Sequence, residues 1–172
     1  MVSDGTILDY LEADHARLHD LLDRAMAKPQ LDLEAFSEFR RGLLRHIAIE
    51  EKVLLPAVRH ARGGVPLDRA HELRIDHAAL TSLLVPTPDR ALCTEIVLLL
   101  SSHDAKEEVA GGIYDECKRW QTHDELILLA KQAESFPDVR IAKHFDGPLV
   151  HRTAASALAS AQRIRAPKGS EG

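Results

Sequence analysis

The chain has 172 residues, of which 45% are hydrophobic and only 4% aromatic, and its formal net charge is −5. This length fits one ordinary domain with an appendage, and the low aromatic content disfavours a β-sandwich or barrel. The negative charge and the lack of a dense Lys/Arg run argue against a nucleic-acid partner, and no apolar run approaches the roughly eighteen residues of a membrane span.

Helical periodicity runs through the chain, without convincing strand alternation. Apolar spacing predicts helices over about residues 6–27, 32–62, 67–85 and 89–120, with Asp32 as an N-cap of the second. Pro56 should kink that helix, and Gly111 and Gly112 should loosen the fourth before it resumes. Four amphipathic helices with short connections predict an all-α, up-down-up-down four-helix bundle, which we assign to residues 1–120.

Beyond residue 121 the pattern changes. Thr122 and Glu125 form a capping-box pair that predicts a helix ending before Pro137, and a last amphipathic helix is expected over about residues 148–164. The final stretch, APKGSEG, resembles a frayed end. We therefore interpret residues 121–172 as a helical appendage, through which a protein partner could bind, and not as a second domain.

An internal repeat carries the strongest signal. DHARLHDLL around His15 matches DHAALTSLL around His77, and HIAIEE at His46 matches HDAKEE at His103. The order is DHxxL, HxxxEE, DHxxL, HxxxEE, with one element on each predicted bundle helix. Such self-similarity indicates two helical hairpins related by a pseudo-two-fold axis.

Polar members of this repeat fall on the apolar faces of their helices. Glutamates are almost never fully buried unless they are paired, and an unpaired buried carboxylate costs several kcal/mol. Two carboxylates that face four imidazoles therefore indicate a pair of metal ions, which bundle cores commonly hold. The candidate ligands are His15, His46, Glu50, His77, His103 and Glu107.

The ligand types narrow the choice of metal. Imidazole and carboxylate suit iron, and also zinc or manganese, whereas the lack of thiolate argues against copper(I) or an iron–sulfur cluster. A closed structural zinc site would need only about four ligands. We therefore favour two irons that Glu50 and Glu107 bridge, each with two terminal histidines.

These motifs resemble the hemerythrin family, specifically the bacterial hemerythrin-like (HHE) cation-binding domains, over about residues 7–120. The resemblance implies a four-helix bundle around a non-heme di-iron centre with an oxo or hydroxo bridge. The ligands that it implies are His15 and His46 for one iron, His77 and His103 for the other, and Glu50 and Glu107 as bridges.

Two positions depart from the oxygen carriers of that family. Those proteins have a fifth histidine one turn before the third-helix ligand, where this chain has Leu73. Their second carboxylate is an aspartate five residues after its histidine, whereas Glu107 comes four residues after His103. Each iron would then be five-coordinate with an open position, which favours peroxide chemistry or redox sensing over oxygen transport.

Several neighbouring residues leave alternatives open. Glu51 and Glu108 are expected beside the core, either next to the ligands or in solvent. The alternative is that Glu51 replaces Glu50, or Glu108 replaces Glu107, as a metal ligand. Asp14 and Asp76 are either solvated or orient a neighbouring imidazole. His19 follows His15 by one turn and is a candidate fifth histidine, although its repeat counterpart is Thr81.

The remaining expectations concern tyrosines, the other histidines, cysteines and the N-terminus. Tyr10 and Tyr114 are expected to pack on helix surfaces, with an approach to the metals as the alternative. The histidines outside the repeat should lie on the surface, with His144 and His151 as alternatives that fold over the site; the set is His60, His71, His123, His144 and His151. Cys93 and Cys117 form no CxxC pair, and MVSDGTILDY lacks the regions of a signal peptide, so we expect a cytoplasmic protein.

The expected function is that of a non-heme di-iron protein that binds O₂, peroxide or NO in oxidative or nitrosative stress defence. Whether it is an enzyme stays open; peroxide disproportionation or other redox chemistry at iron is the activity to test. The alternative is a non-enzymatic iron or oxygen sensor that acts through a partner, or a module that binds iron or zinc for storage alone.

Overall fold

The computed structural model describes residues 5–165, and they contain helices and connections but no strand. Within this range no helix is both long and apolar enough to cross a membrane. The expected frayed end, APKGSEG, lies outside the described residues. The helices are α1 (Ile7–Met26), α2 (Leu33–Ile49), the π-helical segment η1 (Glu50–Leu54), α3 (Leu55–Ala61), α4 (Ala70–Leu83), α5 (Arg90–Glu108), α6 (Ile113–Trp120), α7 (His123–Glu134) and α8 (Ala154–Arg165).

Capping side chains fix where the helices begin. The Asp32 carboxylate accepts from the backbone N–H groups of Glu34 and Ala35, which confirms the predicted N-cap of α2. The predicted capping box of Thr122 and Glu125 is present at the start of α7. These caps satisfy backbone donors that a helix N-terminus otherwise leaves without partners.

Two helices begin later than expected. α4 starts at Ala70, not just after Pro66, because residues 68 and 69 first form a turn that the bond from the Ala70 N–H to the Leu67 carbonyl closes. α8 starts at Ala154, not near residue 148, and the Thr153 hydroxyl accepts from the Ser156 N–H at its start. Residues 136–153 instead form a long connection without regular structure.

The helix that contains Pro56 changes its hydrogen-bond pattern and then continues. Pro56 lacks an N–H and cannot donate to the carbonyl of the preceding turn. Just before it, the Leu55 N–H bonds to the Glu50 carbonyl, five residues back, as in a π-helix. The expected disturbance at Pro56 is therefore a π-helical segment that begins at Glu50, in the first HxxxEE motif.

The corresponding place in the other half is a clear break between α5 and α6. Gly111 has a φ of 76°, a conformation that residues with a Cβ rarely adopt. A Cβ on Gly112 would lie 2.6 Å from the Glu107 carbonyl oxygen and 2.7 Å from that of Val109. The two glycines thus permit the loosening that the sequence predicted.

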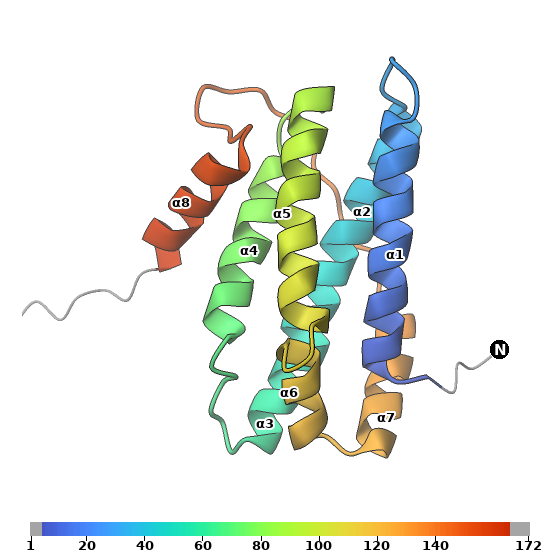
Figure 1. The fold of residues 1–172 in the computed structure, drawn as a ribbon, viewed down its shortest axis with the longest axis vertical. Helices are drawn as coiled ribbons and strands as arrows, with labels where there is room; N and C mark the ends of the chain where they lie inside the picture. The colour runs from blue at the N-terminus through green and yellow to red at the C-terminus, as the bar shows by residue number, and fades with distance from the viewer. Residues whose placement is uncertain (1–4, 166–172) are drawn as a thin grey trace, which may run out of the picture.

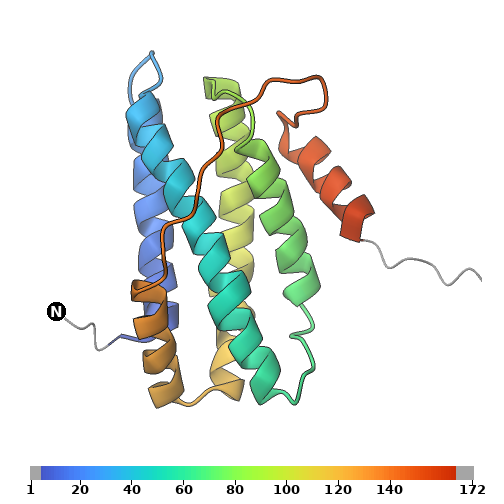
Figure 2. The same cartoon turned by 180° about the vertical axis from the view of Figure 1, so that it is seen from behind.

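Figures 1 and 2 show α1, α2, α4 and α5 as long helices that lie side by side along the long axis of the molecule. α1 packs on α2 and α5, and α4 packs on α5. α7 packs on α1 at one end, whereas α8 packs on α4 near the other, and the connection between them crosses α2 (Figure 2). Residues 121–165 therefore lie against the other helices along much of their length.

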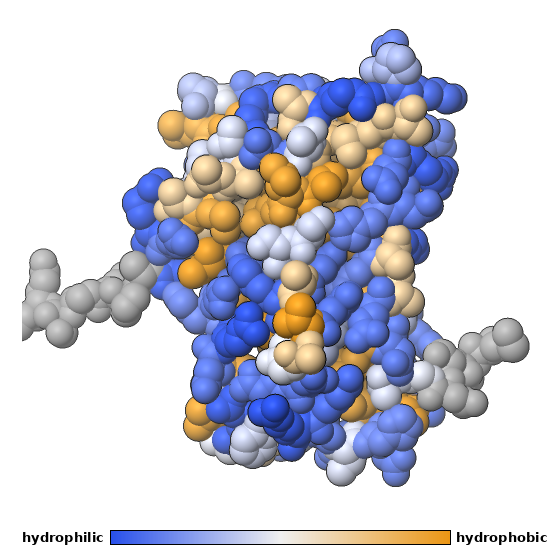
Figure 3. Space-filling view, viewed as in Figure 1, coloured by the Kyte–Doolittle hydropathy of each residue, from blue (hydrophilic) through white to orange (hydrophobic). Residues whose placement is uncertain are grey.

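The apolar core is divided into two clusters by a layer of polar side chains. One cluster lies toward the α1–α2 turn and includes part of α8, and the other includes part of α7. On the surface, Figure 3 shows apolar residues gathered mainly in the upper part of the view and a mostly hydrophilic lower part. Buried residues that bracket the polar layer are Leu18, Leu43, Leu80 and Leu100 on one side and Leu11, Leu54, Leu73 and Ile113 on the other.

Candidate metal centre

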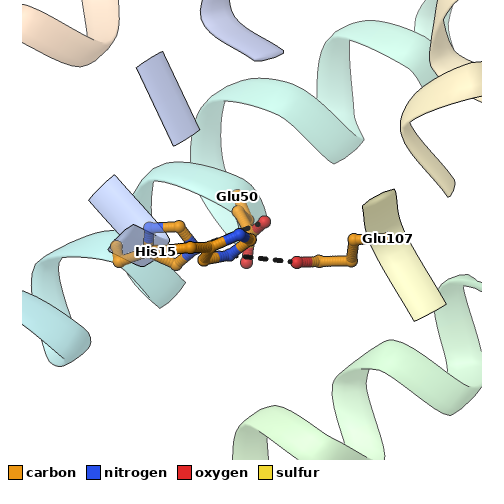
Figure 4. A group of neighbouring side chains, drawn as sticks. His15, Glu50 and Glu107 are labelled. Carbon is orange, nitrogen blue, oxygen red and sulfur yellow. Dashed lines mark hydrogen bonds and ion pairs between the residues drawn. The ribbon is translucent and has the colours of Figure 1, made fainter. Parts of the chain in front are cut away.

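All six sequence-predicted ligands lie in the polar layer, and none is more than 3% exposed. Their nitrogen and oxygen atoms form two groups, in each of which the atoms lie within 4.8 Å of one another. Figure 4 shows His15, Glu50 and Glu107 pointing toward one another from three different elements. The two groups are His15, His46, Glu50 and Glu107, and Glu50, His77, His103 and Glu107.

Helix geometry accounts for this convergence. Residues four apart share one face of a helix, so His46 lies beside Glu50 and His103 lies beside Glu107. The Nε2 to carboxylate distances within these pairs are 3.6 Å and 3.5 Å. Contacts between helices complete the groups: His15 Nε2 lies 3.0 Å from His46 Nε2 and 3.3 Å from Glu107 Oε2, and His77 Nε2 lies 3.0 Å from Glu50 Oε2.

Each of the four histidines faces a carboxylate with its other ring nitrogen. A carboxylate at Nδ1 favours a proton there and leaves Nε2 as the free donor atom. Glu51 and Glu108, and likewise Asp14 and Asp76, thus lie beside the imidazoles and not in the two groups. The Nδ1 to oxygen distances are 2.5 Å for His15–Glu108, 3.1 Å for His46–Asp14, 2.8 Å for His77–Glu51 and 3.7 Å for His103–Asp76.

Cations hold three of these outer carboxylates in place. Asp14 pairs with Arg17 at 2.7 Å, Glu51 with Arg74 at 3.0 Å, and Asp76 with Lys106 at 2.6 Å. Burial alone would raise the pKa of each carboxyl, but the neighbouring histidine and cation outweigh it and lower the pKa below its usual value. The carboxylates therefore stay ionised and available to the imidazole N–H groups.

The buried cluster is electrostatically crowded. Burial disfavours a charged imidazole at His46, but the charges of Glu50 and Asp14 raise its pKa to about 10. Burial likewise opposes ionisation of Glu50, yet contact with His46 and His77 lowers its pKa well below the usual range. For Glu107, burial and the nearby Glu50 charge both raise the pKa. Protons thus occupy part of this layer when no other cation does.

Several polar atoms in this layer lack a hydrogen-bond partner among the described residues. They are Glu50 Oε2, His77 Nε2, both ring nitrogens of His103 and Glu107 Oε1. Although His77 Nε2 and Glu50 Oε2 lie 3.0 Å apart, they do not form a hydrogen bond of suitable geometry. Unsatisfied buried polar groups are costly, and imidazole with carboxylate is a donor set that suits iron, zinc or manganese. The residues present therefore fit a pair of cations.

Comparison with protein families agrees with this geometry. The family model described as the hemerythrin HHE cation-binding domain matches residues 6–109. The chain belongs to the hemerythrin HHE family. Searches among curated proteins and among solved structures found no match.

For Tyr114, the structure agrees with the alternative from the sequence, an approach to the centre, and not with the favoured packing on a helix surface. This tyrosine is 1% exposed, and its hydroxyl lies 3.0 Å from Glu50 Oε1 and 3.3 Å from Glu107 Oε2. Its ring lies almost parallel to that of His15, with centroids 6.1 Å apart. Burial and the two carboxylates raise its pKa well above the usual value, so it remains a hydrogen-bond donor.

The other candidates lie outside the two groups. Tyr10 contacts Arg45, whose Nη1 donates to its hydroxyl at 2.6 Å. His19 points at Asp104, with 2.7 Å between Nε2 and Oδ2, and so does not enter the centre as a fifth histidine. Leu73, at the position of that histidine in oxygen carriers, is buried among apolar residues of the hemerythrin domain. His144 is exposed and lies near Phe36, away from the site.

Proposed function

We propose that this protein is a non-heme di-iron protein that binds O₂, peroxide or NO, with a role in oxidative or nitrosative stress defence. In this proposal α1, α2, α4 and α5 are the four antiparallel members of the bundle. His15 and His46 hold one iron, His77 and His103 hold the other, and Glu50 and Glu107 bridge them.

One observation carries the proposal: two ligand groups share the same two glutamates. Two separate metal sites would not need common residues, whereas a carboxylate-bridged pair does. The bridging carboxylates also neutralise part of the charge of two cations in a buried layer, where uncompensated charge is expensive. The match of residues 6–109 to a cation-binding family supports the same interpretation.

Bound iron would supply redox chemistry and coordination positions for a small ligand. The chain's own groups prepare the surroundings. Tyr114 donates a hydrogen bond to the glutamates and keeps one proton at a fixed place between them. The four outer carboxylates orient the imidazoles, and the two apolar clusters exclude water above and below the layer.

Metal analysis of the purified full-length chain, together with its absorption spectrum, tests this function. About two irons per chain, with near-ultraviolet bands of a coupled ferric pair, are expected. About one metal per chain, or none, after anaerobic loading with Fe²⁺ would refute the di-iron assignment. Peroxide consumption, compared between wild type and Glu50→Ala, then tests whether the protein is an enzyme.

A sensor is the second candidate, and the contacts of Arg45 favour it. Arg45 precedes His46 in α2 and donates to the carbonyl oxygens of Ala133 and Phe136 at 2.8 Å each. The residue next to a proposed ligand thus holds the end of α7. Capture of a protein partner that depends on iron, without peroxide turnover, would favour this alternative over an enzyme.

We also propose a cytoplasmic location. Cys93 and Cys117 are both buried and unpaired with each other, as expected in a reducing compartment. Burial raises the pKa of the Cys93 thiol to about 11 and that of Cys117 to about 12, so neither is a reactive thiolate. Fractionation of cells that produce the protein would test the location.

A further inference from the structure

Two surface hollows are related to each other by the internal repeat. One reaches His15 between α1 and α5 and has a volume of about 390 Å³. The other reaches His77 beside α2 and α4 and has a volume of about 400 Å³. Their linings correspond through the repeat: Glu108 matches Glu51, Ala16 matches Ala78, and the histidines match each other. The internal repeat therefore allows the two hollows to be compared residue by residue.

The floors of the two hollows differ in chemistry. The residue directly after the HxxxEE histidine is Asp104 in the His15 hollow and Ile47 in the His77 hollow. The residue one turn after the DHxxL histidine is His19 in the His15 hollow and Thr81 in the His77 hollow. The His15 side therefore has a carboxylate and an imidazole where the His77 side has an apolar side chain and a hydroxyl.

Asp104 is held with one oxygen free. It is 7% exposed, and its Oδ2 accepts from His19 Nε2 at 2.7 Å. Its Oδ1 lies 3.6 Å from His15 Nε2 and has no hydrogen-bond partner among the described residues. His15 Nε2 is the same atom that lies 3.0 Å from His46 Nε2, so Asp104 Oδ1 faces the point where the first ligand group converges.

From this asymmetry we propose that Asp104, positioned by His19, is a further ligand of the metal held by His15 and His46, which makes the two metal positions unequal. The inference rests on the proposed two-metal centre. A separation of 3.6 Å between Oδ1 and His15 Nε2 suits two donor atoms of one ion, and carboxylate oxygen is an ordinary iron ligand. At the other position Ile47 offers no donor atom, so that metal keeps its open coordination position.

A simple buried ion pair between Asp104 and His15 explains the contact less well. His15 already faces Glu108 through Nδ1, and its Nε2 is close to His46 and to Glu107 as well as to Asp104. One proton on Nε2 cannot satisfy all three neighbours, whereas one cation can accept electron pairs from all of them. His19 also uses its hydrogen bond on the outer oxygen, which leaves the inner one directed at the centre.

The test uses the full-length chain and Co²⁺ as the probe metal. Wild type, Asp104→Asn and the control Ser101→Ala, an exposed residue of the same hollow, are titrated with Co²⁺ against a competing chelator. Metal stoichiometry, the two stepwise affinities and the intensity of the visible Co²⁺ bands are measured. These bands strengthen when the coordination number of Co²⁺ falls, so they report a lost ligand without any assay of activity.

We expect wild type and Ser101→Ala to bind the metal at two unequal affinities. Asp104→Asn should weaken one of them by about tenfold or more, since even loss of an outer-shell partner costs that much. The Co²⁺ bands of the same step should strengthen. His19→Leu should weaken the same step less, and His19→Gln, which keeps a donor for Asp104, should restore most of the loss.

The outcomes separate the two proposals. Wild type that binds fewer than about two Co²⁺ ions would overturn the two-metal centre itself. Wild type with two ions and an Asp104→Asn variant with unchanged affinities would overturn only the role of Asp104. A weaker affinity with unchanged band intensity would also overturn direct ligation, because the coordination number would then be the same.

Discussion

The two halves of the centre share a plan but differ in one place. Each half contributes a DHxxL histidine, an HxxxEE histidine and its glutamate, and each outer carboxylate contacts an imidazole on another helix. Beside the His15 group alone lie the buried Asp104 of α5 and the half-buried His19 of α1, which contact each other. The common parts are those that two cations in a buried layer would require. The difference lies at the His15 hollow, where, in our proposal, it alters one metal position and not the other.

The largest effect is expected from the residues that the halves share. Glu50→Ala and Glu107→Ala should each abolish binding of both metals, because each glutamate belongs to both ligand groups. Metal content per chain, measured after anaerobic loading, is the readout. Glu38→Ala, an exposed glutamate of α2, is the control. Retention of both metals by either bridging variant would refute the shared-carboxylate arrangement.

The next largest effect is expected when a histidine is removed from one ligand group alone. His46→Ala and His103→Ala each remove a ligand from one group only, so each variant should keep about one metal per chain at moderate metal concentration. The His103→Ala variant, which retains the Asp104 side, should hold its remaining metal more tightly than the His46→Ala variant. Equal affinities in the two variants would argue that the halves are equivalent.

Metal binding should depend on pH through displaced protons. The pKa of His46 is raised to about 10 in the metal-free protein, so this imidazole is protonated at pH 7 and must lose its proton to bind a metal. Apparent affinity should therefore rise as the pH rises toward 10, by about tenfold per pH unit for each proton displaced. Proton release, measured with a pH indicator in weak buffer, checks this. Binding without release at pH 7 would contradict it.

The raised pKa of His46 also affects the stability of the metal-free protein. This stability should fall with rising pH, whereas the metal affinity should increase. Since the folded-state pKa of His46 lies above its unfolded value of 6.5, its contribution to stability is complete below pH 6.5 and is lost as the pH rises toward 10. The Tm of metal-free protein should fall over that window. In His46→Gln this part of the pH dependence should disappear, and its persistence would assign it to other groups.

Gly112 lies at the break between α5 and α6, and a substitution there tests how rigid this break is. Gly112→Ala should destabilise the protein by about 2 kcal/mol, because the added Cβ meets backbone carbonyl oxygens that cannot move independently. Denaturant unfolding measures the loss. The exposed neighbour Val109 serves as control, and Val109→Ala should change stability little. An unchanged midpoint for Gly112→Ala would mean that the break relaxes freely.

The smallest effect is expected at Tyr114. Tyr114→Phe keeps the packing but removes the hydroxyl near Glu50 and Glu107, at a cost of about 1 kcal/mol in the free energy of unfolding. Metal content should be unchanged. Tyr10→Phe, which removes a hydroxyl away from the centre, should leave the absorption spectrum as in wild type, whereas Tyr114→Phe should shift it. Identical spectra would show that the hydroxyl does not act on the centre.

The sequence predicted most of the helices and the membership of the six-residue cluster for clear physical reasons. Helical periodicity and capping residues act locally, and the repeat marks polar residues on apolar faces. The position of Tyr114 was hard to predict because the helix breaks after Val109. The side on which α6 residues lie therefore does not follow from the periodicity of α5. The pairing of Asp104 with His19 escaped because it joins α1 to α5, and no periodicity within one helix reports which helices meet.

The course of residues 136–153 was also beyond prediction. This segment has no helical period, and its position across α2 depends on contacts with distant side chains. Arg40 donates to the Ala142 carbonyl and Arg45 to that of Phe136. Neither arginine stands out in the sequence from others that face solvent.

The helix interruptions after the two glutamates have a dynamic consequence. After Glu50 the ladder becomes π-helical, and after Glu107 it ends within two residues, by different residue choices in the two halves. Amides at these joints should exchange with deuterium faster than those in the middle of α2 and α5, because regular hydrogen bonding stops there. The two carboxylates can thus move when one helical turn opens locally, while amides in the middle of α2 and α5 stay protected from exchange.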